Sequence, residues 1–172
     1  MLPRMRQRAF HPDGPVSAHR LEIRAAGMAD LEALVDTRVA LFRELEGLSE
    51  SAEVEFRARC RDIMAQLLGD GRGVAWLAVT PEHAVQGAAF LLEFPRLPSP
   101  RNLRSREGYA LSVYVTPEFR RQGVASALMA GAIAEARQRG HARVRLHATP
   151  DGRPVYERLG FKGRDDEMEL VL

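Results

Sequence analysis

Apolar residues recur along this chain with two different spacings, which predict its helices and strands. Intervals of three and four positions predict a helix from about Asp30 to Gly47, a second from Ser49 or Ser51 to Gly69, and a third ending near Arg139. Their apolar positions are Leu31, Leu34, Val35, Leu41, Phe42 and Leu45, then Phe56, Cys60, Ile63, Met64, Leu67 and Leu68, and finally Val124, Ala125, Leu128, Met129, Ala132 and Ala136. Alternation of apolar and polar residues predicts strands over 19–24, 74–80, 84–94, 109–115, 144–148 and 168–172, with a short helix from Asp151 before the last.

The order of these elements predicts an α/β fold with a mixed, mostly antiparallel central sheet that has helices on both faces. Residues 19–172 are expected to form a single domain. Residues 1–18 are expected to be a disordered basic tail, because they are rich in arginine, proline and glycine. Within the strand over 84–94, Gly87 indicates either a bulge or a close approach of another backbone segment.

Charge is distributed unevenly along the chain. The first 20 residues hold four arginines and one aspartate, a charge of +3, whereas the whole chain carries +2. The remaining residues therefore sum to −1, so they offer no basic surface excess for nucleic acid. A tail that binds RNA or an acidic partner is an alternative to a simple disordered extension.

Bulk composition is that of an ordinary globular protein, with 45% hydrophobic and 28% charged residues. No apolar run approaches the roughly 20 residues that span a bilayer, and the N-terminus lacks the apolar segment of a secretory signal. We therefore expect a cytoplasmic protein with no membrane association. The single cysteine, Cys60, excludes an intrachain disulfide, and no cysteine or histidine cluster has the spacing of a metal site.

The segment from Val115 to Ala125 predicts an anion site. A strand ends before Pro117, an arginine-rich turn with Gly123 follows, and a helix begins at once. Such a turn directs backbone N–H groups toward one point at the positive end of a helix, where phosphate commonly binds. An ordinary strand-to-helix connection with two solvated arginines is the alternative.

A second segment, Arg153 to Phe161, makes the interpretation of the first segment more specific. Together the two resemble the GCN5-related N-acetyltransferase (GNAT) family. The family's pyrophosphate loop, Gln/Arg-x-x-Gly-x-Gly/Ala, is matched by Arg120, Gly123 and Ala125, and its Tyr-Glu-x-Leu-Gly-Phe signature is matched from Tyr156 to Phe161. The resemblance covers residues 20–172 and is firmest over 109–161.

This resemblance implies the GNAT fold and a transfer of the acetyl group of acetyl-CoA to a primary amine, by direct attack in a ternary complex. It implies that loop amides hold the pyrophosphate and that the central strand pairs with the pantetheine arm. The cofactor-binding residues implied are Val113, Tyr114, Val115, Arg120, Arg121, Gln122, Gly123, Val124, Ala125, Ser126 and Asp151. At Asp151 the family more often has an asparagine.

The resemblance makes Tyr156 the candidate general acid, which would protonate the departing thiolate. The general base is less defined, because the central strand lacks the glutamate found in many relatives. Glu93, Glu107 and His147 are the candidates, with water as an alternative. A structural role, with the phenol packed beside Leu159, is the alternative for Tyr156.

The acceptor remains open between small-molecule amines, amino-acid-like compounds and peptide or protein amines. The loop with Pro95, Pro98 and Pro100 also holds Arg96, Arg101, Arg104 and Arg106, so it either lines an acceptor pocket for an acidic substrate or is a solvated surface loop. The alternative function is a non-catalytic coenzyme A-binding sensor or structural module. A homodimer is also compatible with the resemblance.

Overall fold

The computed structural model describes residues 21–100, 103–164 and 168–171. The expected tail, residues 1–18, lies outside the described residues, as does Arg101. In chain order the elements are β1 (Glu22–Ala26), the 3-10 turn η1 (Met28–Asp30), α1 (Leu31–Glu46), α2 (Glu50–Gly69), β2 (Gly73–Val79), β3 (Val85–Pro95), β4 (Arg106–Val115), the 3-10 turn η2 (Pro117–Phe119), α3 (Val124–Gln138), β5 (Val144–Arg145) and α4 (Arg153–Arg158).

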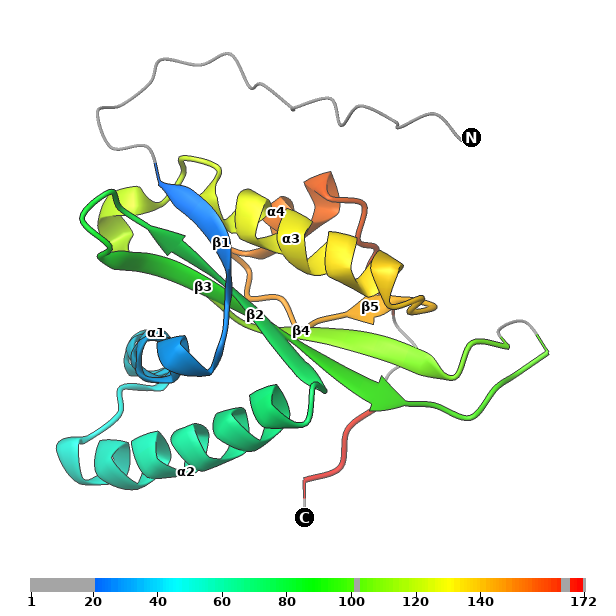
Figure 1. Cartoon of the computed structure of the whole chain (residues 1–172), viewed down its shortest axis with the longest axis horizontal. Coiled ribbons are helices and arrows are strands. Elements are labelled where there is room, and N and C mark those ends of the chain that lie inside the picture. Colours follow the sequence, from blue (N-terminus) through cyan, green and yellow to red (C-terminus); the bar gives the residue numbers. More distant parts are fainter. Residues whose placement is uncertain (1–20, 101–102, 165–167, 172) are drawn as a thin grey trace.

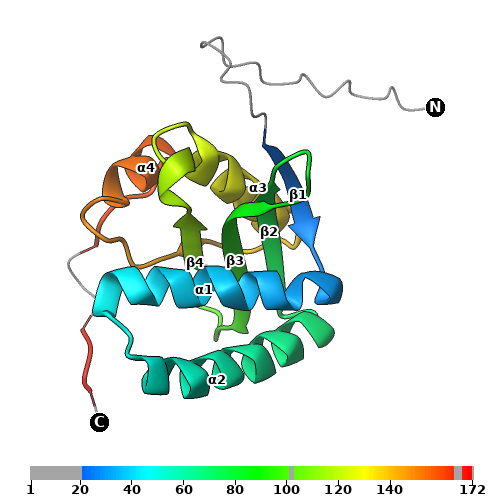
Figure 2. The same cartoon turned by 90° about the vertical axis from the view of Figure 1, so that its left-hand side faces the viewer.

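The strands form one five-stranded sheet in the order β1-β2-β3-β4-β5. The first three pairings are antiparallel, and β4 pairs with β5 in parallel. Helices α1 and α2 lie on one face of the sheet, whereas α3 and α4 lie on the other (Figures 1 and 2). The predicted α/β fold, with a mixed and mostly antiparallel sheet, is therefore confirmed.

Local signals in the sequence set the helix ends. The side chain of Ser49 caps α2 by accepting a hydrogen bond from the Ala52 amide at 3.4 Å. Gly47 ends α1 in the left-handed conformation, at φ +66°, which glycine adopts without a steric penalty. Of the two predicted caps for the second helix, Ser49 is the one in use.

The core between the sheet and the α1/α2 layer is apolar. Its fully or nearly fully buried residues include Leu34, Val35, Val39, Cys60, Met64, Leu77 and Phe90. Two predicted core positions are wrong, because Leu45 is 50% and Ile63 is 54% exposed. The side of α2 that packs on the core consists of Phe56, Cys60, Met64, Leu67 and Leu68. Ile63 lies beside this stripe and faces solvent.

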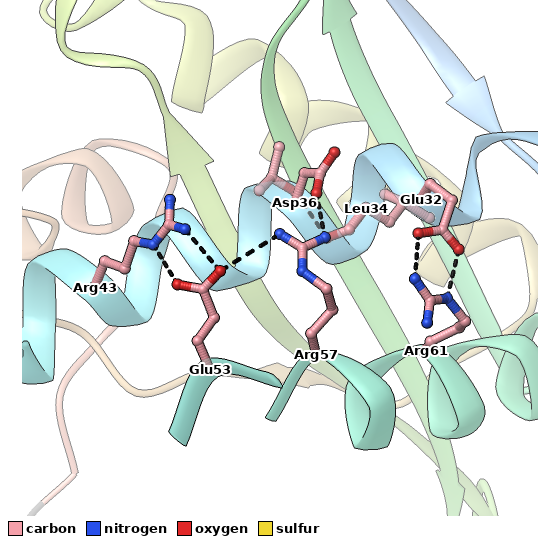
Figure 3. A network of polar contacts seen from close by, with 8 residues as sticks. Glu32, Leu34, Asp36, Arg43, Glu53, Arg57 and Arg61 are labelled. Atoms are coloured by element: carbon pink, nitrogen blue, oxygen red, sulfur yellow. Dashed lines mark hydrogen bonds and ion pairs between the residues drawn. The ribbon is translucent and has the colours of Figure 1, made fainter. Parts of the chain in front are cut away.

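Ion pairs tie α1 to α2 along their outer side (Figure 3). Arg43 forms a two-point contact with Glu53, with both N···O distances at 2.6 Å, and Arg61 forms another with Glu32 at 2.5 and 2.6 Å. A further pair joins Arg57 to Asp36. The order of these pairs shows that α1 and α2 are antiparallel. The pairs hold the two helices together as one layer.

Two predicted strands differ from the structure. The strand predicted over 144–148 is limited to Val144–Arg145, where it pairs with the start of β4. Residues 168–171 of the predicted last strand belong to no strand, and Met168, Leu170 and Val171 are exposed; Leu172 lies outside the described residues. A strand needs an edge to pair with, and β5 presents only two residues, which alternation in the sequence could not reveal.

Candidate functional site

The centre of β4 is interrupted by a β-bulge. Leu111 pairs with Phe90 and Tyr114 pairs with Ala88, so Ser112 and Val113 together oppose Ala89. Ser112 has φ +52°, a left-handed conformation that is uncommon for a residue with a side chain. Its Oγ accepts a 2.6 Å hydrogen bond from an Arg38 N–H of α1. The bulge is thus braced from the α1 side of the sheet.

The pairing of β4 with β5 stops early. Gly108 pairs with Val144 and Tyr109 with Arg145, and no later pair joins the two strands within the described residues. The part of β4 that holds Val113, Tyr114 and Val115 therefore has no strand beside its β5 edge in the part of the chain described here. Main-chain groups at such an edge can pair with an extended ligand.

The loop that follows β4 gathers backbone amides. Arg121 and Gly123 both have left-handed backbones, at φ +62° and +82°. Helix α3 begins at Val124 without a side-chain cap, and its first internal hydrogen bond runs from Ala127 to the Gly123 carbonyl. The amides of residues 124–126 thus have no acceptor within the helix, and they lie at its positive end. We call the amides of residues 121–126 the amide cradle.

The cradle has room for a ligand. A Cβ atom built on Gly123 would meet no other atom within 4 Å, so the backbone there is open to its surroundings. Alternating right- and left-handed residues direct consecutive amides inward and form anion-binding concavities. Arg121 is exposed beside the cradle, and Gln122 donates a hydrogen bond to the Glu118 carbonyl at 2.9 Å. The donor set fits a phosphate or pyrophosphate group.

The side chain of Arg120 is bound within the protein. Its Nε donates to the Val115 carbonyl at 2.8 Å, and one NH₂ group lies 2.8 and 2.7 Å from the two carboxylate oxygens of Glu44. Tyr114 donates to the same carboxylate at 2.8 Å. Burial raises the pKa of Glu44, but the hydrogen bonds from Arg120 and Tyr114 outweigh it and leave this pKa below its ordinary value.

Tyr156 lies on α4, which lies beside α3 (Figures 1 and 2). Its ring packs edge-on against Phe161, with the centroids 5.9 Å apart. Burial raises the pKa of Tyr156 above its ordinary value, so the phenol stays protonated at neutral pH. Asp151 is exposed in the turn that leads into α4.

The candidate bases are separated by the structure. His147 is exposed just beyond β5, where β4 and β5 diverge, and its Nδ1 contacts the hydroxyl of Tyr109. Glu93 pairs in register with Gly108, near the other end of β4, and its carboxylate contacts His141 Nε2 at 2.7 Å. Gly108 and Tyr109 are neighbours in β4, so Glu93 and His147 both lie near its β5 end. They differ in surroundings, because Glu93 is bound to His141 whereas His147 is exposed.

Glu107, the third candidate base, is a buried structural charge. It is 0% exposed, and three guanidinium groups surround its carboxylate. Arg96 lies at 3.3 Å, Arg143 at 3.1 Å and Arg145 at 3.2 Å, N to O. Because a buried carboxylate requires compensation, these arginines account for its burial. The basic loop before β4 contributes Arg96 to this cluster.

A match to a family model identifies the family of this chain. Residues 39–161 match the family model described as Acetyltransferase (GNAT) family. The chain belongs to this family. The family predicted from the two sequence motifs is thereby confirmed, and the protein is an acetyl-CoA-dependent GNAT acetyltransferase.

Solved structures support the family assignment. A predicted acetyltransferase from Clostridium acetobutylicum, solved with acetyl-CoA, is 26% identical with a TM-score of 0.80, over 88% of this chain and 96% of that one. A GCN5-related N-acetyltransferase from Ralstonia eutropha is 31% identical with a TM-score of 0.77, over 88% and 99%. Glucosamine-6-phosphate N-acetyltransferase from Arabidopsis thaliana, at 17% identity and a TM-score of 0.65 over 88% and 98%, shares the fold. No curated protein matches the chain.

Sequence reasoning did not single out Arg38, Glu44 or Ser112 for this site. Ser112 carried a signal, because it is a polar residue within an apolar strand. Arg38 and Glu44 carried none, since charged residues on a surface helix are common. Over residues 21–100, 103–164 and 168–171, no cluster of three or more metal-ligating side chains occurs, and no helix combines the length and apolar character that crossing a bilayer requires.

Proposed function

We propose that this GNAT acetyltransferase transfers the acetyl group to a primary amine, by direct attack in a ternary complex. The observation that carries the proposal is the amide cradle at the start of α3, directly after the open edge of β4. The two features lie end to end, as a ligand with a pyrophosphate and an extended arm would require. Cys60 is buried in the α1/α2 core, which supports direct attack over a covalent cysteine intermediate.

Acetyl-CoA supplies an acetyl thioester, whose carbonyl carbon receives the amine as the carbon–sulfur bond breaks. The amides of residues 121–126 would hold its pyrophosphate, and the exposed Arg121 side chain would add a charge-assisted contact. The backbone from Val113 to Val115 would hold the pantetheine arm along the β4 edge. Arg120 shapes the loop through Val115 and Glu44, and Asp151 remains a predicted contact before α4.

Tyr156 is the proposed general acid. The departing thiolate needs a proton, and a phenol whose pKa is raised by burial holds one at neutral pH. Among the described residues, the Tyr156 hydroxyl has no hydrogen-bond partner, so it is available to a bound ligand. The position of Tyr156 on α4, beside α3, supports this role.

His147 is the proposed base that removes a proton from the ammonium group of the acceptor, directly or through water, so that the neutral amine can attack the thioester carbonyl. Its exposure at the divergence of β4 and β5 makes it accessible to an acceptor. The contact with the Tyr109 hydroxyl orients the imidazole ring. The residues around the β4 bulge would contact the acceptor, whether it is a small amine or a peptide.

The experiment is a calorimetric titration of acetyl-CoA, followed by an assay of thiol release with a panel of primary amines. Binding together with amine-dependent thiol release supports an N-acetyltransferase. Binding without thiol release from any amine would support the non-catalytic coenzyme A module instead. Absence of binding by the folded protein would contradict the cradle as the cofactor site.

A further inference from the structure

Arg38 occupies an unusual position beneath the β4 bulge. One of its N–H groups donates to Ser112 Oγ at 2.6 Å. Ser112 directly precedes Val113, so the guanidinium lies close to the proposed cofactor-binding segment of β4. The same guanidinium carbon lies 4.8 Å from the ring centre of Phe42 and 5.8 Å from that of Phe56. Aromatic rings thus lie close to the Arg38 guanidinium from α1 and from α2.

No carboxylate compensates the charge of Arg38 within the described residues. Three other arginines of the same layer are paired with a carboxylate: Arg43 with Glu53, Arg57 with Asp36 and Arg61 with Glu32 (Figure 3). Arg38 is partly buried, and its one polar contact in the described chain is the neutral hydroxyl of Ser112. A guanidinium has five N–H donors, so most of them remain available.

A partly desolvated cation without a counter-charge is costly unless an anion binds to it. The planar fork of a guanidinium matches a carboxylate, which can accept two parallel hydrogen bonds. A carboxylate bound here would lie beside the bulge, next to the strand segment that receives the acetyl thioester under the proposed function. The amine of the same molecule could then reach the thioester.

We propose that Arg38 binds a carboxylate of the acceptor, so that the substrate is an amine that also carries a carboxylate, such as a free amino acid. This inference rests on the proposed acetyl transfer at the β4 edge and names the substrate class of that same site. Phe42 and Phe56 orient the guanidinium, and Ser112 holds it against the bulge.

The test compares amino acids with their amides, which differ in the charge of one group and little in size. Amine-dependent thiol release from acetyl-CoA gives kcat/KM for each amino acid and for its amide, in the wild type and in Arg38→Gln. Arg59→Gln is the matched control, because Arg59 is an exposed arginine of α2. Ser112→Ala removes the brace while keeping the guanidinium. Phosphoethanolamine and ethanolamine form a further pair, and acetyl-CoA affinity is measured for every variant.

We expect the wild type to prefer at least one amino acid over its amide by about 10- to 100-fold, the range of a charged hydrogen-bonded pair. Arg38→Gln should abolish the preference without changing acetyl-CoA affinity, whereas Arg59→Gln should keep it in full and Ser112→Ala should keep it in weakened form. Equal rates for acids and amides, an equal loss for both in Arg38→Gln, a preference confined to phosphoethanolamine, or no reaction with any amino acid would overturn the proposal. Failure to bind acetyl-CoA would instead overturn the proposed function.

Discussion

Arg120 and Glu44 join the phosphate-binding loop to α1 across 76 residues of sequence, with N···O distances of 2.8 and 2.7 Å. The family motif assigns Arg120 to the pyrophosphate, but here its side chain binds Glu44 and the Val115 carbonyl. Arg120 therefore holds the end of β4 and the loop in place, and the proposed pyrophosphate contacts fall to the backbone amides and the exposed Arg121. The α1 layer and the cofactor loop are thus mechanically connected.

Replacing Tyr156 with phenylalanine tests the general acid. We expect Tyr156→Phe to lower kcat by about 100-fold, within the range for loss of a general acid, and to leave acetyl-CoA affinity unchanged. Because burial raises the pKa of Tyr156, the wild-type rate should not fall through ionisation of this phenol until the pH exceeds about 10. Steady-state kinetics against pH measure both effects, and a kcat equal to that of the wild type would exclude the role.

His147 and Glu93 are distinguished by parallel substitutions to glutamine. His147→Gln should lower kcat with little change in the unfolding temperature, because the side chain is exposed. Glu93→Gln should lower the unfolding temperature with little change in kcat, because its carboxylate contacts His141 at 2.7 Å and Arg106 at 3.5 Å. Kinetics and thermal unfolding of both variants provide the measurement. A loss of kcat in Glu93→Gln alone would reverse the assignment.

Sequence patterns predicted the features that depend on nearby residues. The cap at Ser49, the end of α1 at Gly47 and the turn at Gly123 follow from local chemistry, and all three occur in the structure. Contacts between distant segments left no such signal. The pairing of Arg120 with Glu44 and the brace from Arg38 to Ser112 depend on how α1 crosses the sheet (Figure 2).

The strand errors have a related cause. Alternation over 144–148 and 168–172 indicated strands, but alternation says nothing about the length of the partner edge. The bulge at Ser112 was also not predicted, and it lies three residues beyond Tyr109, the last residue of β4 that pairs with β5. Gly87 was expected to mark a bulge or a close backbone approach, and its built Cβ would lie 2.7 Å from the Tyr114 carbonyl oxygen.

This close approach makes Gly87 sensitive to substitution. Gly87→Ala should lower the free energy of unfolding by about 1–3 kcal/mol, the usual cost of overpacking, because its Cβ would press on the backbone of β4. Gly27→Ala is the control, since a Cβ there would meet nothing within 4 Å. Denaturant unfolding compares the two variants, and equal stabilities would refute the close approach.

The α1/α2 layer should become less stable in acid. Hydrogen bonds from Arg43 lower the pKa of Glu53, and those from Arg61 lower the pKa of Glu32. Because these pKa values are lower in the folded state, the ion pairs contribute fully to the stability of the fold above about pH 4.3, the ordinary glutamate pKa. This contribution is lost as the pH falls through the lowered pKa values. The unfolding temperature should therefore drop below pH 4, and less steeply in Glu53→Gln. An equally steep drop in this variant would contradict the assignment.

Calorimetric titration of acetyl-CoA into Gly123→Glu tests the amide cradle as the pyrophosphate site. The substitution places a side chain and a negative charge where the pyrophosphate should bind. Gly140→Glu is the matched control, because Gly140 at the other end of α3 also has a positive φ, +71°, and open space around its built Cβ. We predict that the wild type and Gly140→Glu bind acetyl-CoA and that a folded Gly123→Glu does not. Equal binding by all three proteins would show that the pyrophosphate does not bind at the cradle.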